Sequence, residues 1–168
     1  MKIRDMTRCA MFAALLAVCA WISVPVGDLA VSLQTFAVFL TLGALGGRMG
    51  SLTFLVYLSL GAVGLPVFTG MQGGLGILMG PTGGYLWGFL ATGLIFWALE
   101  DRSPLWLTLV FGLLGCYVCG TVWYYFAYAH TGLWAVFLKC VVPYLIPDGA
   151  KLAVALLVMP RLKKAILR

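Results

Sequence analysis

The sequence predicts an all-α integral membrane protein built from six transmembrane helices. Hydrophobic residues make up 63% of the 168 residues, charged residues make up 10%, and the mean hydropathy is +1.06. A soluble domain carries roughly 25% charged residues, so this much apolar surface must face lipid. Backbone polar groups in lipid must be satisfied within helices or a closed barrel. The apolar runs are continuous and lack period-2 alternation, which favours helices in a single domain over residues 1–168.

Six apolar stretches are long enough to cross a membrane, since a hydrocarbon core of ~30 Å needs about 20 helical residues. Glycine, proline and charged residues separate them. A further stretch, 67–81, is too glycine-rich for a helix and too apolar for a solvated loop. Irregular backbone of this kind is tolerated in a membrane only where it is buried in protein or lines a cavity. The six predicted spans cover approximately residues 6–25, 30–47, 50–66, 82–99, 104–128 and 144–160.

Positive charges lie mainly at the two ends of the chain. With the N-terminus inside the cell, nine of the eleven Lys and Arg residues lie on the cytoplasmic side, and only Lys139 and Lys151 lie outside. Because cytoplasmic segments are enriched in Lys and Arg, we expect both termini inside. This topology places the glycine-rich stretch, Asp28 and Asp148 toward the outer face. The net charge of +6 is explained by these flanks, so no nucleic-acid partner is expected.

Asp148 and Lys151 are a conspicuous polar pair, because ionisable groups within a span are costly and mark function by default. Their i, i+3 spacing places them on one helix face. Pro147 suits the first turn of a helix, where the helix dipole would favour an ionised Asp148. Two interpretations are open: an internal ion pair, or a pair presented to a ligand. A cyclic urea, with two N–H donors beside one carbonyl acceptor, complements a carboxylate next to an ammonium.

Two further groups are candidate pocket residues. Gly73 and Gly74 allow either close backbone approach to a ligand or tight helix packing. No Gly-Lys-Ser/Thr follows the glycines, so the chain has no Walker A motif, and any ATP hydrolysis must come from another polypeptide. Gln34 and Thr35, at the start of the second span, either line a pocket or bond to a neighbouring helix.

Small residues form a stripe on the first helix. Ala10 and Ala14, and Ala13 and Ala17, are spaced four apart, which lets another helix of this chain or of a partner approach closely. Neither a cofactor nor a metal is expected, because the pair of cysteines at 116 and 119 lacks a second pair and a nearby histidine. An aromatic cluster is typical of a membrane interface; it comprises Trp123, Tyr124, Tyr125 and Tyr128.

Five motifs occur in order along the chain: Leu33–Val38, Leu60–Phe68, Gly73–Gly76, Gly80–Tyr85, and Pro147-Asp148-x-x-Lys151. Together they resemble the BioY family, the biotin-binding S components of energy-coupling factor transporters. The resemblance implies a six-helix S-component fold. It also implies a biotin pocket near the extracellular face, under the loops that join helices one to two, three to four and five to six.

The resemblance also assigns roles to residues. It implies that Asp148 accepts from the ureido N–H groups and that Lys151 donates to the ureido oxygen or the carboxylate, with Gly73, Gly74 and Tyr85 bordering the pocket. Some members carry a basic residue directly after the Gly-Pro-Thr-Gly-Gly-Tyr motif, where this chain has Leu86. Binding of the ligand's carboxylate then falls to backbone N–H groups, Lys151, Gln34 or Thr35.

The implied function is substrate binding in an ATP-driven biotin uptake transporter of the bacterial cell membrane. The implied partners are a transmembrane coupling subunit, on which Ala10, Ala14 and Ala17 would dock, and two ATPase subunits. The S component would carry its pocket inward by toppling in the membrane. The alternatives are an S component for a different vitamin, a structural membrane subunit, or a membrane enzyme using Asp148 and Lys151. We do not expect an enzyme, because no nucleophile, metal cluster or second carboxylate lies nearby in the sequence.

Overall fold

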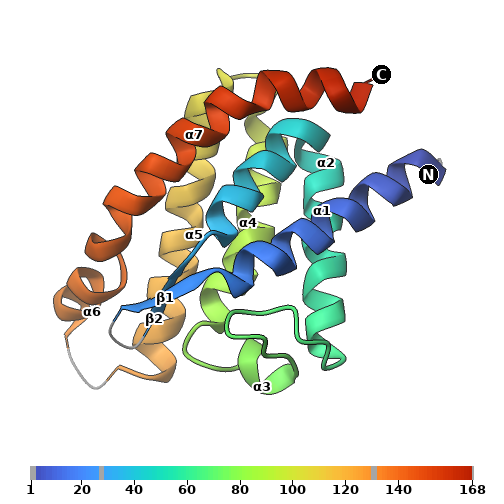
Figure 1. The fold of residues 1–168 in the computed structure, drawn as a ribbon. Helices are drawn as coiled ribbons and strands as arrows, with labels where there is room; N and C mark the ends of the chain where they lie inside the picture. The colour runs from blue at the N-terminus through green and yellow to red at the C-terminus, as the bar shows by residue number, and fades with distance from the viewer. Residues whose placement is uncertain (1–2, 27–28, 130–131, 168) are drawn as a thin grey trace.

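The protein is a bundle of long helices that is covered at one end by a β-hairpin and an irregular loop (Figure 1). The computed structural model describes residues 3–26, 29–129 and 132–167. The elements are α1 (Ile3–Trp21), β1 (Ser23–Val26), β2 (Leu29–Ser32), α2 (Gln34–Ala62), α3 (Leu75–Leu78), α4 (Gly83–Leu99), α5 (Leu105–Ala127), α6 (Leu133–Cys140) and α7 (Val142–Leu167).

The second and third predicted spans form one kinked element, α2. Gly46 has φ +79° and ψ 173°, a conformation that glycine adopts without strain, and it divides α2 into two rods. The backbone N–H of Gly47 donates to Glu100 Oε2 at 2.8 Å, which ties the break to the end of α4. With both rods of α2 counted, the described residues contain six long helical segments, in agreement with the predicted six-helix fold. By length and composition alone, α2, α5 and the stretch Leu133–Lys164 are apolar enough to cross a membrane.

The first connection differs from the prediction. The first helix ends at Trp21 rather than at residue 25, and residues 30–32 belong to a strand rather than to the second helix. Strands β1 and β2 pair antiparallel, with Ser23 opposite Ser32. Pro25 disfavours the helical conformation of the residue before it, which explains why the chain leaves the helix early. Asp28, expected at the outer face, lies outside the described residues.

The last predicted span, 144–160, also starts earlier and is preceded by a helix that the sequence did not indicate. Helix α7 begins at Val142, so Pro147 lies inside the helix rather than in its first turn. A proline removes only one backbone hydrogen bond, and the helix continues through it because one face of α7 is packed against the bundle. Helix α6 has eight residues, too few for a span, and buries Val136 and Cys140 beside α5 and α7.

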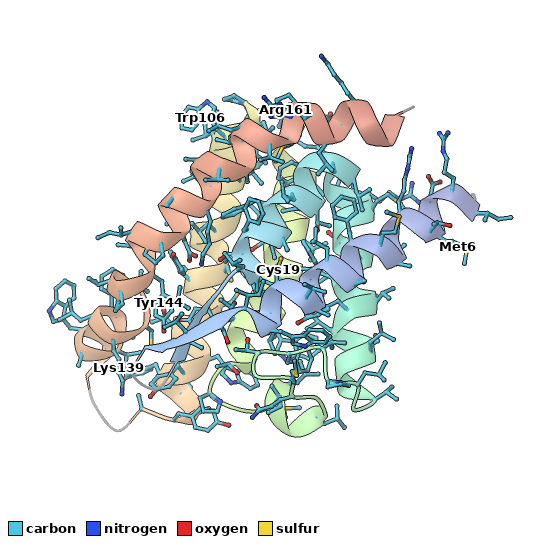
Figure 2. All side chains as sticks on the ribbon, viewed as in Figure 1. Met6, Cys19, Trp106, Lys139, Tyr144 and Arg161 are labelled. Atoms are coloured by element: carbon cyan, nitrogen blue, oxygen red, sulfur yellow. The ribbon has the colours of Figure 1, made fainter. Side chains whose placement is uncertain are left out.

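Basic residues lie at both ends of the bundle. Figure 2 shows Arg161 at the end opposite α3 and Lys139 near α6 at the other end. Both chain ends point away from the hairpin and α3 (Figure 1). The cytoplasmic location of the termini stays a prediction from the distribution of Lys and Arg along the sequence. Lys2 and Arg168, which belong to the same basic flanks, lie outside the described residues.

Helices α4 and α5 pack closely at small residues. A Cβ atom on Gly88 would lie 2.8 Å from Cys116 Sγ and 3.1 Å from Cys116 Cα. Nearby, the Thr92 hydroxyl donates to the carbonyl oxygen of Gly112 at 2.9 Å, a hydrogen bond between the two helices. This contact fixes the position of α5, which carries two side chains of the cavity described below.

We expect Gly88→Ala to destabilise the protein by about 1–3 kcal/mol, because α4 and α5 would have to separate to accommodate the methyl group. Gly149→Ala is the matched control, since a Cβ on Gly149 meets nothing within 4 Å. Thermal unfolding in detergent measures both. An unchanged melting temperature in Gly88→Ala would contradict the close contact.

Candidate functional site

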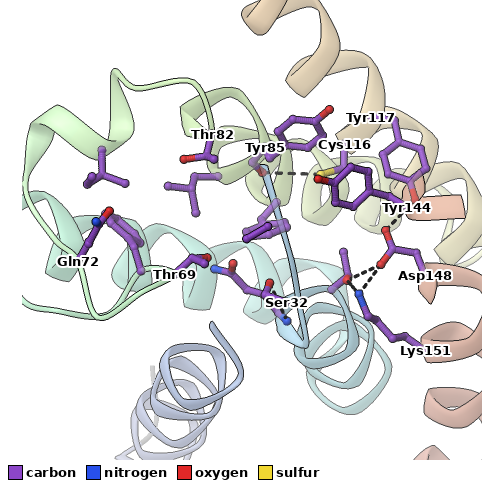
Figure 3. A pocket seen from close by; sticks show the side chains of 17 residues that line it. Ser32, Thr69, Gln72, Thr82, Tyr85, Cys116, Tyr117, Tyr144, Asp148 and Lys151 are labelled. Carbon is purple, nitrogen blue, oxygen red and sulfur yellow. Dashed lines mark hydrogen bonds and ion pairs between the residues drawn. The ribbon is translucent and has the colours of Figure 1, made fainter. Parts of the chain in front are cut away.

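A cavity of about 300 Å³ lies at the covered end of the bundle. Strand β2, the first turn of α2, the loop 63–82 and helices α4, α5 and α7 all contribute to its wall. Figure 3 shows side chains from these elements converging on one space. The lining residues are Ala30, Ser32, Gln34, Thr35, Phe68, Thr69, Gln72, Ile77, Thr82, Tyr85, Leu86, Phe89, Cys116, Tyr117, Tyr144, Asp148 and Lys151.

The predicted ion pair lies at one end of this cavity. Lys151 Nζ lies 2.7 Å from Asp148 Oδ1, and the two side chains are only 10% and 4% exposed. Thr35 joins them: its hydroxyl donates to Asp148 Oδ1 at 2.8 Å and accepts from Lys151 Nζ at 3.1 Å. The prediction that both charges lie on one helix face is confirmed, and a polar side chain of α2 bonds to both of them.

A third donor to the carboxylate comes from α5. The Tyr117 hydroxyl donates to Asp148 Oδ2 at 2.7 Å, so both carboxylate oxygens accept hydrogen bonds from side chains. Tyr117 is 31 positions away in the sequence and lies in an apolar run. The one sequence signal that could have revealed this contact was a tyrosine in the middle of a predicted span, because a buried tyrosine hydroxyl usually needs a hydrogen-bond partner.

The helix terminus near Asp148 is not the one that the sequence suggested. Asp148 lies in the second turn of α7, but its partner Thr35 is the second residue of α2. The N-terminus of a helix carries a partial positive charge, which favours a nearby carboxylate. Asp148 therefore contacts the N-terminal turn of α2 through Thr35 and lies beyond the first turn of its own helix.

Gln34 fixes the wall of the cavity from within the protein. Its Nε2 atom donates to the Tyr57 hydroxyl at 2.7 Å, and Tyr57 in turn donates to the backbone oxygen of Val67 at 2.7 Å. Gln34 is 4% exposed and Tyr57 is fully buried. This relay attaches α2 to the loop 63–82, whose Phe68 and Thr69 enter the cavity wall.

Aromatic donors hold the remainder of that loop. Trp21 Nε1 donates to the backbone oxygen of Pro66 at 2.8 Å, and Trp123 Nε1 donates to that of Gly80 at 3.0 Å. Tyr128 donates to the backbone oxygen of Met79. Members of the aromatic cluster on α5, interpreted above as an interfacial belt, thus bind the loop. The glycine-rich stretch is a cover with defined anchors at both ends.

The three motif residues expected to border the pocket differ in their positions. Tyr85 lines the cavity, and its hydroxyl donates to the backbone oxygen of Cys140 at 2.9 Å. Gly73 and Gly74 are not among the lining residues. A Cβ on Gly73 would lie 2.2 Å from the backbone oxygen of Leu65, and Gly74 has φ +100°. These two glycines shape the loop, and their contact with a ligand stays a prediction.

The alanine stripe on α1 is divided between two environments. Ala10 and Ala14 are exposed, whereas Ala17 is 7% exposed and packs in the core. A partner helix can therefore reach Ala10 and Ala14 but not Ala17. The cysteine pair is divided as well, because Cys116 lines the cavity and Cys119 does not. Within the described ranges, no three His, Cys, Asp or Glu side chains gather to hold a metal.

A cavity with a mixed apolar and polar lining and an ion pair in its wall, at one end of a helical membrane bundle, is typical of a membrane protein that binds a small solute, and the fold agrees with this class. The crystal structure of the S-component for biotin from an ECF-type ABC transporter superposes with a TM-score of 0.84 at 26% identity. That alignment covers 96% of this chain and 92% of the other. The protein thus has the S-component fold.

The sequence matches the BioY family over residues 1–168, and the chain belongs to that family. It is 40% identical over 165 residues to the biotin transporter BioY of Thermotoga maritima, with 96% of each chain covered. It is 37% identical over 165 residues to a probable biotin transporter BioY of Pyrococcus horikoshii, with 97% of this chain and 98% of the relative covered. Sequence similarity therefore extends over the whole bundle, including the end that holds the cavity and the end that holds the termini.

We expect Tyr57→Phe to loosen the loop 63–82. The change removes the hydroxyl that joins Gln34 to the backbone oxygen of Val67, and a buried group left unpaired costs about 1–3 kcal/mol. Hydrogen exchange of the loop amides should accelerate. Ser59→Ala is the control, because the Ser59 hydroxyl is exposed and bonds only within its own helix. Equal exchange in both variants would show that Tyr57 does not hold the loop.

Proposed function

We propose that this chain is the substrate-binding subunit of an ATP-driven biotin uptake transporter, which captures biotin at the outer face of the cell membrane. The observation that carries the proposal is the buried ion pair of Asp148 and Lys151 in the wall of a cavity, in a chain that belongs to the BioY family. A desolvated acid and base, side by side, form a receptor for a neutral group that has both donors and an acceptor.

The hydrogen bonds already present limit how a cyclic urea can bind. Lys151 donates to Asp148 and Thr35, which leaves one of its three N–H donors for the ureido oxygen. A carboxylate accepts about four hydrogen bonds, and Asp148 already accepts three, one of them on Oδ2. One ureido N–H therefore reaches Asp148 Oδ2. In this proposal Asp148 accepts one ureido N–H, whereas the sequence resemblance implied that it accepts both.

We place the ligand's carboxylate at the opposite end of the cavity. Gln72 and Thr82 lie there, away from Lys151 (Figure 3), and Gln72 is exposed. Lys151 is the one Lys or Arg among the lining residues described, and it is engaged with Asp148. Gln34 and Thr35, which were candidates for this role, already bond within the protein. Neutral donors of the loop therefore take the carboxylate.

Transport in this proposal needs other subunits. The chain carries no Walker A motif, so the proposed energy source is a pair of ATPases that act through a transmembrane coupling subunit. The proposed location is the bacterial plasma membrane, with both termini in the cytoplasm because the Lys and Arg residues gather at that end. Ala10 and Ala14 form the proposed docking face on α1.

The purified protein should bind biotin saturably, and excess thiamine or riboflavin should not displace it. Asp148→Asn and Lys151→Ala should each weaken binding by about 3–5 kcal/mol, more than about a hundredfold in Kd, because each leaves the other group without its partner. Titration calorimetry in detergent measures the affinities. Binding as tight as in the unchanged protein would remove both residues from the site.

Two controls accompany this experiment. Asp101→Asn and Lys163→Ala make the same changes at exposed positions outside the cavity lining, and both should bind biotin normally. Mass spectrometry of the ligand recovered after denaturation should return biotin unchanged, whereas a chemically altered product would favour the enzyme alternative. Displacement by another vitamin would favour an S component of different specificity.

Ala10→Leu and Ala14→Leu should weaken assembly with the coupling subunit and leave biotin binding intact. The larger side chains would prevent close approach of a partner helix to α1, where the loss of van der Waals contact is the dominant cost. Co-purification with a tagged coupling subunit measures the assembly. Ala153→Leu is the matched control, because Ala153 is an exposed alanine on α7. Normal assembly in both α1 variants would place the docking face elsewhere.

A further inference from the structure

Tyr144 is a cavity residue that the sequence did not single out. It lies on α7 one turn before Asp148, is 8% exposed, and packs with Tyr117, Val136 and Cys140. Figure 3 shows its ring reaching from α7 into the space between the ion pair and the far end of the cavity. Its hydroxyl oxygen is buried and has no hydrogen-bond partner among the residues that the structure describes.

The other phenols around the cavity are all engaged within the protein. Tyr57 donates to the Val67 oxygen, Tyr85 to the Cys140 oxygen, and Tyr117 to Asp148. An unpaired buried hydroxyl is costly, and each such group in a folded protein calls for an explanation. A phenylalanine would fill the same space as Tyr144 without that cost. The hydroxyl therefore indicates a partner that belongs to the occupant of the cavity.

The acceptor count at the ion pair indicates which part of the occupant this is. A cyclic urea presents two N–H donors, and Asp148 has one open acceptor position, on Oδ2. The second N–H needs another acceptor near the same end. Tyr144 lies at i, i+4 from Asp148, which puts both side chains on the same face of α7. A phenol oxygen accepts as well as donates.

We propose that the Tyr144 hydroxyl binds the bicyclic end of the ligand directly and accepts the ureido N–H that Asp148 has no position left to accept. The inference rests on the proposed biotin-binding function and names a specificity-determining residue within it. The recognition unit is then spread over three side chains of α7: Lys151 for the carbonyl, Asp148 for one N–H, and Tyr144 for the other.

The test compares Tyr144→Phe with Tyr125→Phe, which makes the same change on α5 outside the cavity lining. Tyr144→Phe should melt at or above the temperature of the unchanged protein, because it removes an unpaired buried group. Its affinity for biotin should fall about 2- to 12-fold, the usual effect of one neutral hydrogen bond. Tyr125→Phe should bind as tightly as the unchanged protein.

A second measurement separates a direct contact from a packing effect. Two carbamate analogues of biotin, each with one ureido N–H replaced by oxygen, are titrated into the unchanged protein and into Tyr144→Phe. The two proteins should bind one analogue equally, because the contact is already absent, and should differ for the other. Equal losses with both analogues, or biotin binding by Tyr144→Phe that matches the unchanged protein, would overturn the inference and leave the hydroxyl to a trapped water. Absence of biotin binding in the unchanged protein would instead overturn the proposed function itself.

Discussion

The buried ion pair of Asp148 and Lys151 is the constraint on which the cavity depends. The two charged side chains are at most 10% exposed, so they must pair with each other and find partners for their other hydrogen-bond donors and acceptors. An unpaired charge in a medium of low dielectric is very costly. Thr35 and Tyr117 meet this need, and through them α2 and α5 are tied to α7. The electrostatic requirement of one residue pair thus positions three helices. It also leaves few bonding positions open, and those few determine what can bind.

The cover of the cavity follows a different physical principle. The loop 63–82 has little regular structure, so its backbone groups need partners from elsewhere. Trp21, Tyr57 and Trp123 supply them from three separate helices, each with an N–H or O–H at the end of a large apolar ring. The rings of these aromatic side chains fill space in the bundle, and their N–H or O–H groups donate to backbone oxygens of the loop. A glycine-rich segment can therefore lie over the cavity in a fixed position, and ligand specificity can be built on it.

Sequence reasoning succeeded where the signal was local and failed where it was tertiary. Apolar length predicted the helices, and i, i+3 spacing predicted that Asp148 and Lys151 share a face. The positions of Tyr117 and Tyr144 in the cavity wall were missed, because a tyrosine in an apolar run looks the same whether its hydroxyl faces lipid, a carboxylate or a cavity. The start of α7 was placed too late because Pro147 is a common first-turn residue, and tertiary packing outweighed that preference. The burial of Ala17 depends on which neighbour packs against α1, which residue spacing does not encode.

The packing beyond the cavity bears on how a bound ligand could cross the membrane. From the first turn of α2 toward its kink, and along α7 beyond Lys151, the described side chains fill the space: Phe39, Leu42 and Met159 are at most 1% exposed. A Cβ on Gly43 would lie 1.9 Å from Met159 Sδ, so α2 and α7 are in direct contact there. Opening a path through this contact would forfeit the burial of several large side chains, each worth about 2–5 kcal/mol. The sequence resemblance implies that the whole bundle topples in the membrane, a movement that would leave this core and the ion pair intact. The packing therefore favours transport by reorientation of the protein over passage through it.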